Sequence, residues 1–144
     1  MKTVRHILQD KGHNVWHTTP DALVYDALKI MAEKEVGSLL VLEEGKLVGI
    51  VSERDYARKV ILKGKSSLDT PVGEIMTPKV ISVRPENTIE ECMALMTDKH
   101  IRHLPVVVDE KVVGVVSIGD VVKAELAEKD FLIKQLKNYI TGDR

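Results

Sequence analysis

GIVSERD at Gly49–Asp55 and GVVSIGD at Gly114–Asp120 are two copies of one pattern, in which a glycine and apolar residues lead to a serine and then an aspartate. The copies are 65 residues apart, and the same offset relates the two halves without a gap from Val15 to Arg58. Proline, methionine, lysine, leucine and valine also recur at matched positions. The chain of 144 residues is therefore built mainly from one small unit used twice.

Each copy has the same order of predicted elements. Apolar residues recur with helical spacing over 24–31 and 89–96, which predicts a helix. Two short β-rich runs joined by a polar turn follow at 38–51 and 103–116, which is the pattern of a hairpin. With the strand before the first helix and a second helix that starts after each motif, the unit reads β-α-β-β-α. The predicted fold class is α/β (α+β), with two repeats packed about a pseudo-twofold axis and a cleft between them.

The helices of the two copies are expected to begin differently. Thr88 and Glu91 form a predicted capping box, whereas the first copy has Leu23 at the matching position and should start less sharply. Thr70 and Pro71 are expected to start the short helix that follows, with proline in its favoured early place.

The segments outside the strict repeat set the predicted domain boundaries. Val4–Leu8 matches Val72–Met76 with an offset of 68, so Asp10–Asn14 contains three extra residues, which should make the clefts unequal. We expect the first repeat with an N-terminal helix at 1–62, a linker at 63–71, the second repeat at 72–123 and a helical tail at 124–144. One stripe of the tail is apolar and should pack on the body or on a second subunit: Leu126, Ile133, Leu136 and Ile140.

The composition excludes several classes of protein. A net charge of -1 with 30% charged residues gives no sustained basic face, and 3% aromatics offers few stacking platforms, so we expect no nucleic-acid partner. A single cysteine, Cys92, excludes an internal disulfide. Without a long apolar run or a charged-then-apolar leader, we expect a soluble cytoplasmic protein that does not enter a membrane.

The motif aspartates are the main candidate binding residues. A carboxylate at the start of a helix can accept hydrogen bonds from both hydroxyls of a ribose, and Asp55 and Asp120 are placed for this. Ser52 and Ser117, three residues earlier, offer hydroxyls near the same helix start, where backbone N–H groups favour a phosphate.

These β-α-β-β-α repeats, each ending in Gly-apolar-x-apolar-Ser-x-x-Asp, resemble tandem cystathionine β-synthase (CBS) domains, also called Bateman modules. The resemblance extends from about Val4 to Lys123, and the strings at Glu53–Lys59 and Arg102–Pro105 resemble stand-alone CBS pairs. It implies a regulatory module without catalytic residues or a catalytic cofactor, which binds adenosine-containing ligands such as AMP, ATP or NAD(H). It also implies a homodimer that signals to a protein partner of unknown identity.

The resemblance further implies that each cleft takes its aspartate from one repeat and its remaining residues from the other. One cleft would join Ser117 and Asp120 to Val36, Gly37 and Ser38. The other would join Ser52 and Asp55 to Ile101, Arg102 and His103, with Arg54 and Arg58 adding positive charge, so we expect it to be the more anion-rich.

Other interpretations of these residues remain open. Asp55 and Asp120 could simply cap helices, and Arg102 and His103 could be solvated residues at a helix end. His100, His103 and Cys92 could suggest a metal, although the position of Cys92 on an apolar helical face favours burial, and we expect no metal site. Trp16 is expected to be buried at a cleft wall rather than stacked on a base.

Two other function classes compete with the regulatory module. A dimeric structural scaffold with vestigial clefts would show no stabilisation by ligands. An enzyme would be limited to slow nucleotide hydrolysis, because the chain has no nucleophile elbow, no Walker loop and no clustered metal ligands.

Overall fold

The computed structural model describes residues 2–141 and divides into two compact units. Residues 14–81 with 109–112 are called here the first-repeat unit, and residues 2–13, 82–108 and 113–141 the second-repeat unit. The segment that precedes each repeat in the chain therefore belongs to the unit of the other repeat. The predicted boundaries at 62, 72 and 123 follow chain order and stay a prediction.

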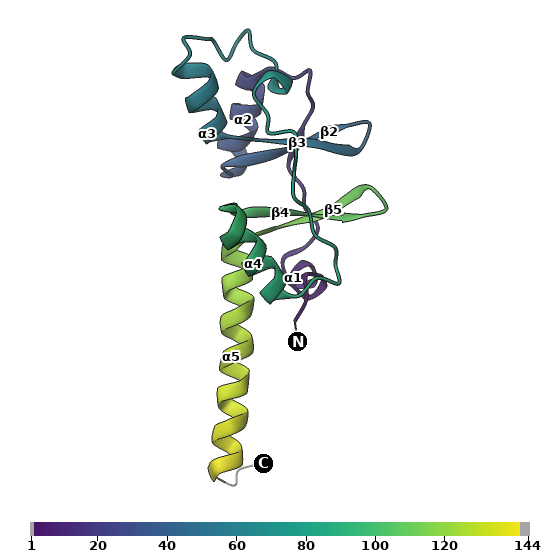
Figure 1. The fold of residues 1–144 in the computed structure, drawn as a ribbon, viewed down its shortest axis with the longest axis vertical. Coiled ribbons are helices and arrows are strands. Elements are labelled where there is room, and N and C mark those ends of the chain that lie inside the picture. Colours follow the sequence, from purple (N-terminus) through teal and green to yellow (C-terminus); the bar gives the residue numbers. More distant parts are fainter. Residues whose placement is uncertain (1, 142–144) are drawn as a thin grey trace. The chain divides into compact units, whose positions relative to one another are not determined.

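The first-repeat unit is a hairpin with helices against it. Its elements are β1 (His17–Thr18), α2 (Val24–Lys34), β2 (Ser38–Glu43), β3 (Lys46–Ser52), α3 (Glu53–Tyr56), a π-helical turn (Ala57–Ile61) and a 3-10 turn (Val72–Glu74). Strand β2 is antiparallel to β3 and parallel to the short β1. Figure 1 shows α2 and α3 on the same side of the hairpin.

The core of the first-repeat unit comes from the apolar positions that the helical and strand periods predict. Its buried members are Val24, Ala27, Met31, Leu39, Val41, Val51, Val60, Val72 and Ile75. Removing each large aliphatic side chain from water stabilises the fold by about 1.5–3 kcal/mol, so this small core depends on the segment at 72–75 that the other repeat's start supplies.

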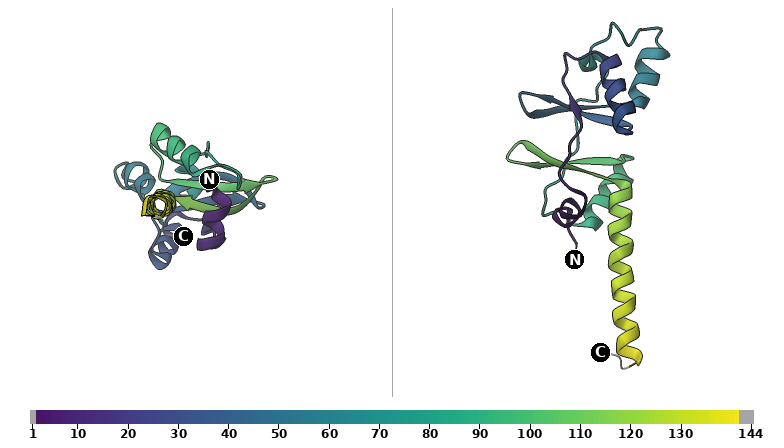
Figure 2. Two further views of the ribbon diagram at one scale, coloured as in Figure 1. Left: turned by 90° about the horizontal axis from the view of Figure 1, so that it is seen from below. Right: turned by 180° about the vertical axis from the view of Figure 1, so that it is seen from behind.

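The second-repeat unit has the same plan with a longer final helix. Its elements are α1 (Val4–Lys11), α4 (Ile89–Lys99), β4 (His103–Val108), β5 (Lys111–Ser117) and α5 (Ile118–Thr141), with the tip of the β4–β5 hairpin assigned to the first-repeat unit. The strand expected before α4 is reduced to a single parallel bridge between Val83 and Val106. Helix α5 contacts α1 and α4, and its C-terminal half continues past both of them (Figure 2).

The motif glycines mark the places where the exchanged segments approach the hairpins. A Cβ at Gly114 would lie 2.6 Å from Cδ2 of Leu8, and one at Gly49 would lie 2.7 Å from Sδ of Met76. Leu8 and Met76 are themselves equivalent under the offset of 68. The glycine therefore allows the same close contact in both units.

The helix starts agree with their predicted differences. Thr88 and Glu91 form the capping box, whereas Leu23 makes no side-chain cap. The first amide of α2 is instead held by the linker, because Val24 N–H donates to the carbonyl oxygen of Thr70 at 2.8 Å. In the second-repeat unit, Ile89 N–H donates in the same way to Lys2 O at 3.2 Å.

Two sequence expectations need correction or completion. Trp16 is 39% exposed, with the Lys34 ammonium 4.7 Å from its ring centre, so the expectation that it is buried was wrong. The predicted tail is continuous with the helix that starts after the motif, and its stripe is not packed on the described body. Among residues 2–141, no helix combines the length and the apolar character needed to cross a membrane.

Candidate functional site

Asp55 lies in a compact hydrogen-bonded turn at the start of α3. Its Oδ2 accepts hydrogen bonds from Ser52 N–H at 3.0 Å and from Ser52 Oγ at 3.1 Å, while Asp55 N–H donates to Ser52 Oγ at 3.1 Å. Oδ1 lies 3.4 Å from Lys59 Nζ, which also donates to the carbonyl oxygen of Ile75 at 3.0 Å. The carboxylate is 15% exposed, and its bonds to Ser52 and Lys59 fix its orientation.

Asp120 repeats this turn at the start of α5 but has a different lysine partner. Its Oδ2 accepts from Ser117 N–H at 2.8 Å, and Asp120 N–H donates to Ser117 Oγ at 3.1 Å. Lys11, from the end of α1, donates to the same Oδ2 at 2.6 Å and to the carbonyl oxygen of Val115 at 2.9 Å. Helix α1 is thus tied to the start of α5.

The pKa of Asp120 lies below its ordinary value of 3.8. Burial pushes this pKa upward, but the hydrogen bond from Lys11, the bonds from Ser117 and the attraction of the Lys11 charge outweigh it. The group is a carboxylate at neutral pH and is 24% exposed.

Each aspartate therefore completes a capping box in which the serine three residues earlier is the N-cap, so the simpler interpretation, with the aspartate itself as N-cap, was wrong in position. A carboxylate in a capping box can still accept further hydrogen bonds, because its two oxygens offer about four acceptor sites. The bonds from Lys11 and from the Ser117 amide both go to Oδ2 of Asp120, which leaves acceptor sites on Oδ1 for a ligand hydroxyl.

Each unit gathers the motif and the loop that precedes the first hairpin strand. Ser38 is opposite Ser52 in the hairpin, and Glu53 N–H donates to the carbonyl oxygen of Gly37 at 3.1 Å, beside Val36. The second-repeat unit brings Ile101, Arg102 and His103 near Ser117 and Asp120 in the same way, through a bond of 2.8 Å from Ile118 N–H to Arg102 O. The expected pairing of each motif with the loop of the other repeat stays a prediction.

His103 differs electrostatically from a simple phosphate-binding cation. Burial lowers its pKa below the ordinary 6.5, and the charges of Lys11 and Arg102 lower it further, against an opposing effect of Asp120. The imidazole is therefore mainly neutral at pH 7 and can contribute a hydrogen bond rather than a charge. Arg54, Arg58 and Arg102 are exposed.

A pocket of about 170 Å³ opens between α1 and the first turns of α5, inside the second-repeat unit. It is lined by Lys2, His6, Ile7, Asp10, Lys11, Asp120, Lys123, Ala124 and Ala127. Sequence reasoning named Asp120 but missed the residues of α1. The three extra residues in the segment at 10–14 could have indicated them, because Asp10 and Lys11 line this pocket.

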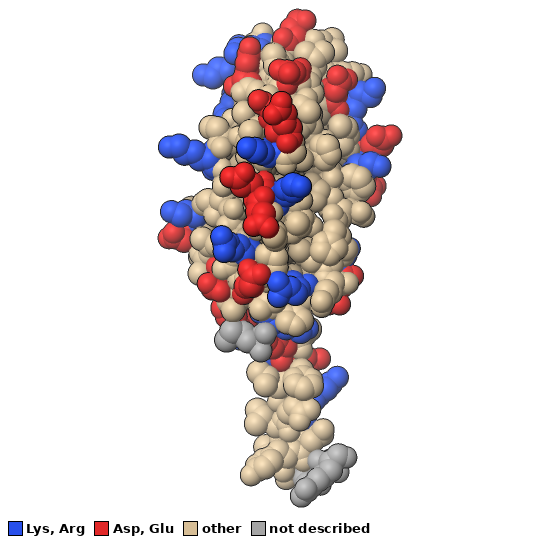
Figure 3. All heavy atoms as spheres, turned by 90° about the vertical axis from the view of Figure 1, so that its right-hand side faces the viewer, with Lys and Arg blue, Asp and Glu red and all other residues tan. Residues whose placement is uncertain are grey.

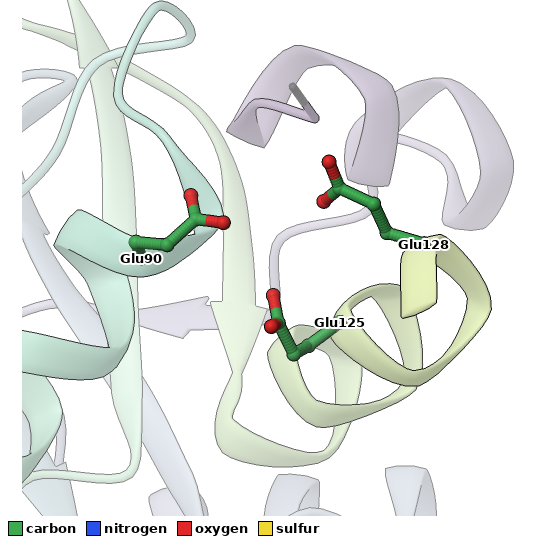
Figure 4. Close-up of side chains that lie close together, drawn as sticks. All are labelled: Glu90, Glu125 and Glu128. Atoms are coloured by element: carbon green, nitrogen blue, oxygen red, sulfur yellow. The ribbon is translucent and has the colours of Figure 1, made fainter. Parts of the chain in front are cut away.

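Three glutamates form a separate cluster on α4 and α5 (Figure 4). Carboxylate oxygens of Glu90, Glu125 and Glu128 lie within 4.8 Å of one another, and Oε2 of both α5 residues is buried without a hydrogen-bond partner. Glu125 also lies 3.7 Å from Lys129 Nζ. The cluster contains neither a histidine nor Cys92, which is fully buried in the core.

Comparison with known proteins gives consistent results. The family model described as "CBS domain" matches residues 4–62 and 72–127. The mitochondrial CBS domain-containing protein CBSX3 of Arabidopsis thaliana is 45% identical over 150 residues, covering 97% of this chain and 72% of that protein. A CBS-domain protein of Burkholderia ambifaria MC40-6 is 50% identical with a TM-score of 0.83, covering 88% of this chain and 95% of that one.

A further solved structure contains a ligand. CBSX2 was crystallised in complex with AMP, and that chain is 31% identical with a TM-score of 0.72, covering 90% of this chain and 99% of that one. CBSX2 is described as a chloroplastic protein of Arabidopsis thaliana.

Proposed function

The chain belongs to the CBS domain family, a non-catalytic family, with two repeats at 4–62 and 72–127, and we propose that it is a sensor of adenosine-containing ligands. AMP, ATP or NAD(H) would bind in clefts between the repeats, and the bound state would be passed to a protein partner. This is a proposal about both motif aspartates, because each repeat retains the complete motif.

The observation that carries the proposal is the AMP complex of CBSX2, which covers 90% of this chain. The site chemistry supports it. The carboxyl groups of Asp55 and Asp120 are acceptors held at matched positions, and each charge-assisted bond to a ribose hydroxyl is worth about 1.5–3 kcal/mol. In the crossed arrangement that we propose, Asp55 works with Ile101, Arg102 and His103, and Asp120 with Val36, Gly37 and Ser38.

Calorimetric titration with AMP and adenosine tests this proposal. Asp55→Ala and Asp120→Ala should each weaken one site by about 10- to 150-fold and leave the other almost unchanged. Arg102→Ala should weaken AMP much more than adenosine at the Asp55 site. Glu33→Ala, at an exposed position on α2, is the matched control and should change neither site.

The competing function is a structural scaffold. If AMP, ADP, ATP, NAD and NADH at millimolar concentration all leave the melting midpoint unchanged, the sensor proposal is wrong and the scaffold remains. Native mass spectrometry of freshly purified protein would identify any co-purified nucleotide directly.

We also propose that the chain forms a homodimer through α5. Beyond Ala127 the helix exposes large apolar residues that the described part of the chain does not cover, and Leu126, Ile133 and Ile140 recur every seven residues. Charged side chains are interspersed over the face shown in Figure 3 but are sparse towards the far end of α5. An apolar stripe of this kind, repeated in a second copy, is self-complementary.

Light scattering tests the dimer. The wild type should give about twice 16.1 kDa, and Ile133→Asp should shift the mass towards the monomer. Lys134→Ala, beside it on the helix, should not. A concentration-independent mass of 16.1 kDa for the wild type would refute the dimer. The cytoplasmic location stays a prediction, since CBSX3 is described as mitochondrial.

A further inference from the structure

We propose that the pocket between α1 and α5 in the second-repeat unit binds a diphosphate group. This inference extends the proposed function, because Asp120, the carboxylate proposed to hold a ribose, forms part of the pocket wall. The pocket is a property of one compact unit and does not depend on the crossed clefts.

The charged groups of the pocket favour an anion. Three lysines line the pocket, Lys2, Lys11 and Lys123, together with the acidic residues Asp10 and Asp120, so positive groups exceed negative ones by one. Lys11 is already oriented by its bonds to Asp120 and to the Val115 carbonyl, which engage two of its three N–H donors. The remaining N–H is pre-positioned for a ligand oxygen.

His6 adds a ring nitrogen that can donate a hydrogen bond. The backbone N–H of Thr3 donates to His6 Nδ1 at 3.0 Å as part of the α1 capping box. Nδ1 is therefore the acceptor, which leaves Nε2 as the N–H donor of the ring. A backbone hydrogen bond from Ile89 N–H to Lys2 O connects the residues before α1 to the start of α4.

The equivalent place in the first-repeat unit holds a long side chain where this pocket has Ala124. Under the repeat offset, Ala124 corresponds to Lys59 and His6 to Glu74. Lys59 crosses that place to reach both Asp55 and the carbonyl oxygen of Ile75. Ala124 is too short to fill the corresponding volume, which is part of the pocket. The lysine that pairs with Asp120 is instead Lys11, from α1.

The volume sets the size of the ligand. A pocket of about 170 Å³ has room for on the order of five water molecules, which a diphosphate group can displace. Such a group has two sources: the terminal phosphates of a nucleotide whose ribose lies at Asp120, or free inorganic diphosphate.

Calorimetry on the full chain at low salt, with AMP, ATP and sodium pyrophosphate as separate probes, tests the assignment. ATP should bind more tightly than AMP at the Asp120 site. Lys123→Ala should reduce this advantage by about 5-fold, and Ala124→Lys, which installs the residue found in the first-repeat unit, should abolish it. Lys134→Ala, an exposed lysine of α5 outside the pocket, is the control for charge.

The outcomes separate the two sources from each other and from the proposed function. Pyrophosphate binding that Ala124→Lys abolishes identifies free diphosphate as sufficient. An effect of the variants on ATP without pyrophosphate binding identifies the nucleotide. If the protein binds pyrophosphate but neither AMP nor adenosine, the sensor proposal is wrong and the diphosphate assignment is supported. If Lys123→Ala and Ala124→Lys both change neither ATP nor pyrophosphate binding, the pocket has been misassigned, even if AMP still binds.

Discussion

Lys11 Nζ lies 2.6 Å from Asp120 Oδ2, although the two residues are 109 positions apart in the chain. The pair joins α1, from the extreme start of the chain, to the motif of the second repeat. In the first-repeat unit the matching carboxylate of Asp55 pairs with Lys59, four residues on, which also donates to the carbonyl oxygen of Ile75. A ligand that engages Asp120 therefore acts directly on an ion pair between residues far apart in the chain, whereas one at Asp55 acts on an ion pair between residues four positions apart.

The Lys11–Asp120 pair should make stability depend on acid pH. Because the folded pKa of Asp120 is below 3.8, its contribution is complete above pH 3.8 and is lost as the pH falls through the folded value. Asp120→Asn should lower the melting midpoint at pH 7 by about 2–4 °C, corresponding to about 1 kcal/mol for this partly exposed pair. The difference from wild type should shrink below pH 3.8 in a series of thermal melts.

A surface pair provides the control for this prediction. Asp98 lies 3.7 Å from Lys99 and its side chain is 76% exposed, so Asp98→Asn should leave the midpoint almost unchanged at every pH. Equal effects of the two substitutions would show that the Asp120 pair is no stronger than a solvated one.

His103 should titrate below the ordinary histidine value. Its lowered pKa means that the neutral form stabilises the fold above pH 6.5 and that this contribution is lost as the pH falls through the folded pKa. His103→Gln should therefore remove part of the stability loss between neutral and mildly acid pH. NMR titration of the His103 ring measures the pKa directly, and a value at or above 6.5 would contradict the burial argument.

Local elements were predictable from the sequence because they depend on nearby residues. The period of two at 38–51 and 103–116 predicts the hairpins, and Thr88 with Glu91 predicts a cap that the structure contains. Because the two copies match without a gap, an element predicted in one copy supports the same element in the other. The 3-10 turn after Pro71 follows from the same local chemistry.

Long-range features were not predictable by these means. The exchange of α1 between repeats leaves no trace in local periodicity, and the partners of Gly114 and Asp120 are Leu8 and Lys11, more than a hundred residues away. The first strand of the second repeat shrinks to a bridge at Val83, although its sequence matches the register of β1. The match of Trp16 with Ile81 under the repeat offset predicts a buried cleft wall, but Trp16 is exposed and its ring contacts the Lys34 ammonium.

Cys92 should be inert to thiol reagents in the folded protein. Burial, with a smaller effect of Glu91, raises the pKa of its thiol to about 11, and the side chain is fully buried beside the core. Labelling by a disulfide reagent at pH 8 should therefore be at least about 100-fold slower than in urea, because little thiolate is present and it is inaccessible. Rapid labelling under native conditions would mean that α4 opens far more readily than its packing indicates.

The two motif glycines should respond differently to alanine. At Gly114 the three atoms nearest to the new Cβ all belong to the Leu8 side chain, which can move, whereas at Gly49 they include the Thr77 carbonyl oxygen at 3.0 Å besides Met76. Overpacking of this kind costs about 1–3 kcal/mol. A double-mutant cycle of Gly114→Ala with Leu8→Ala, measured by urea unfolding, should therefore show a favourable coupling of about 1 kcal/mol or more, since the second change makes room for the first. The corresponding cycle at Gly49 with Met76→Ala should recover less, because a backbone oxygen remains in the way. Equal coupling in both cycles would show that the backbone at Thr77 yields as easily as a leucine side chain.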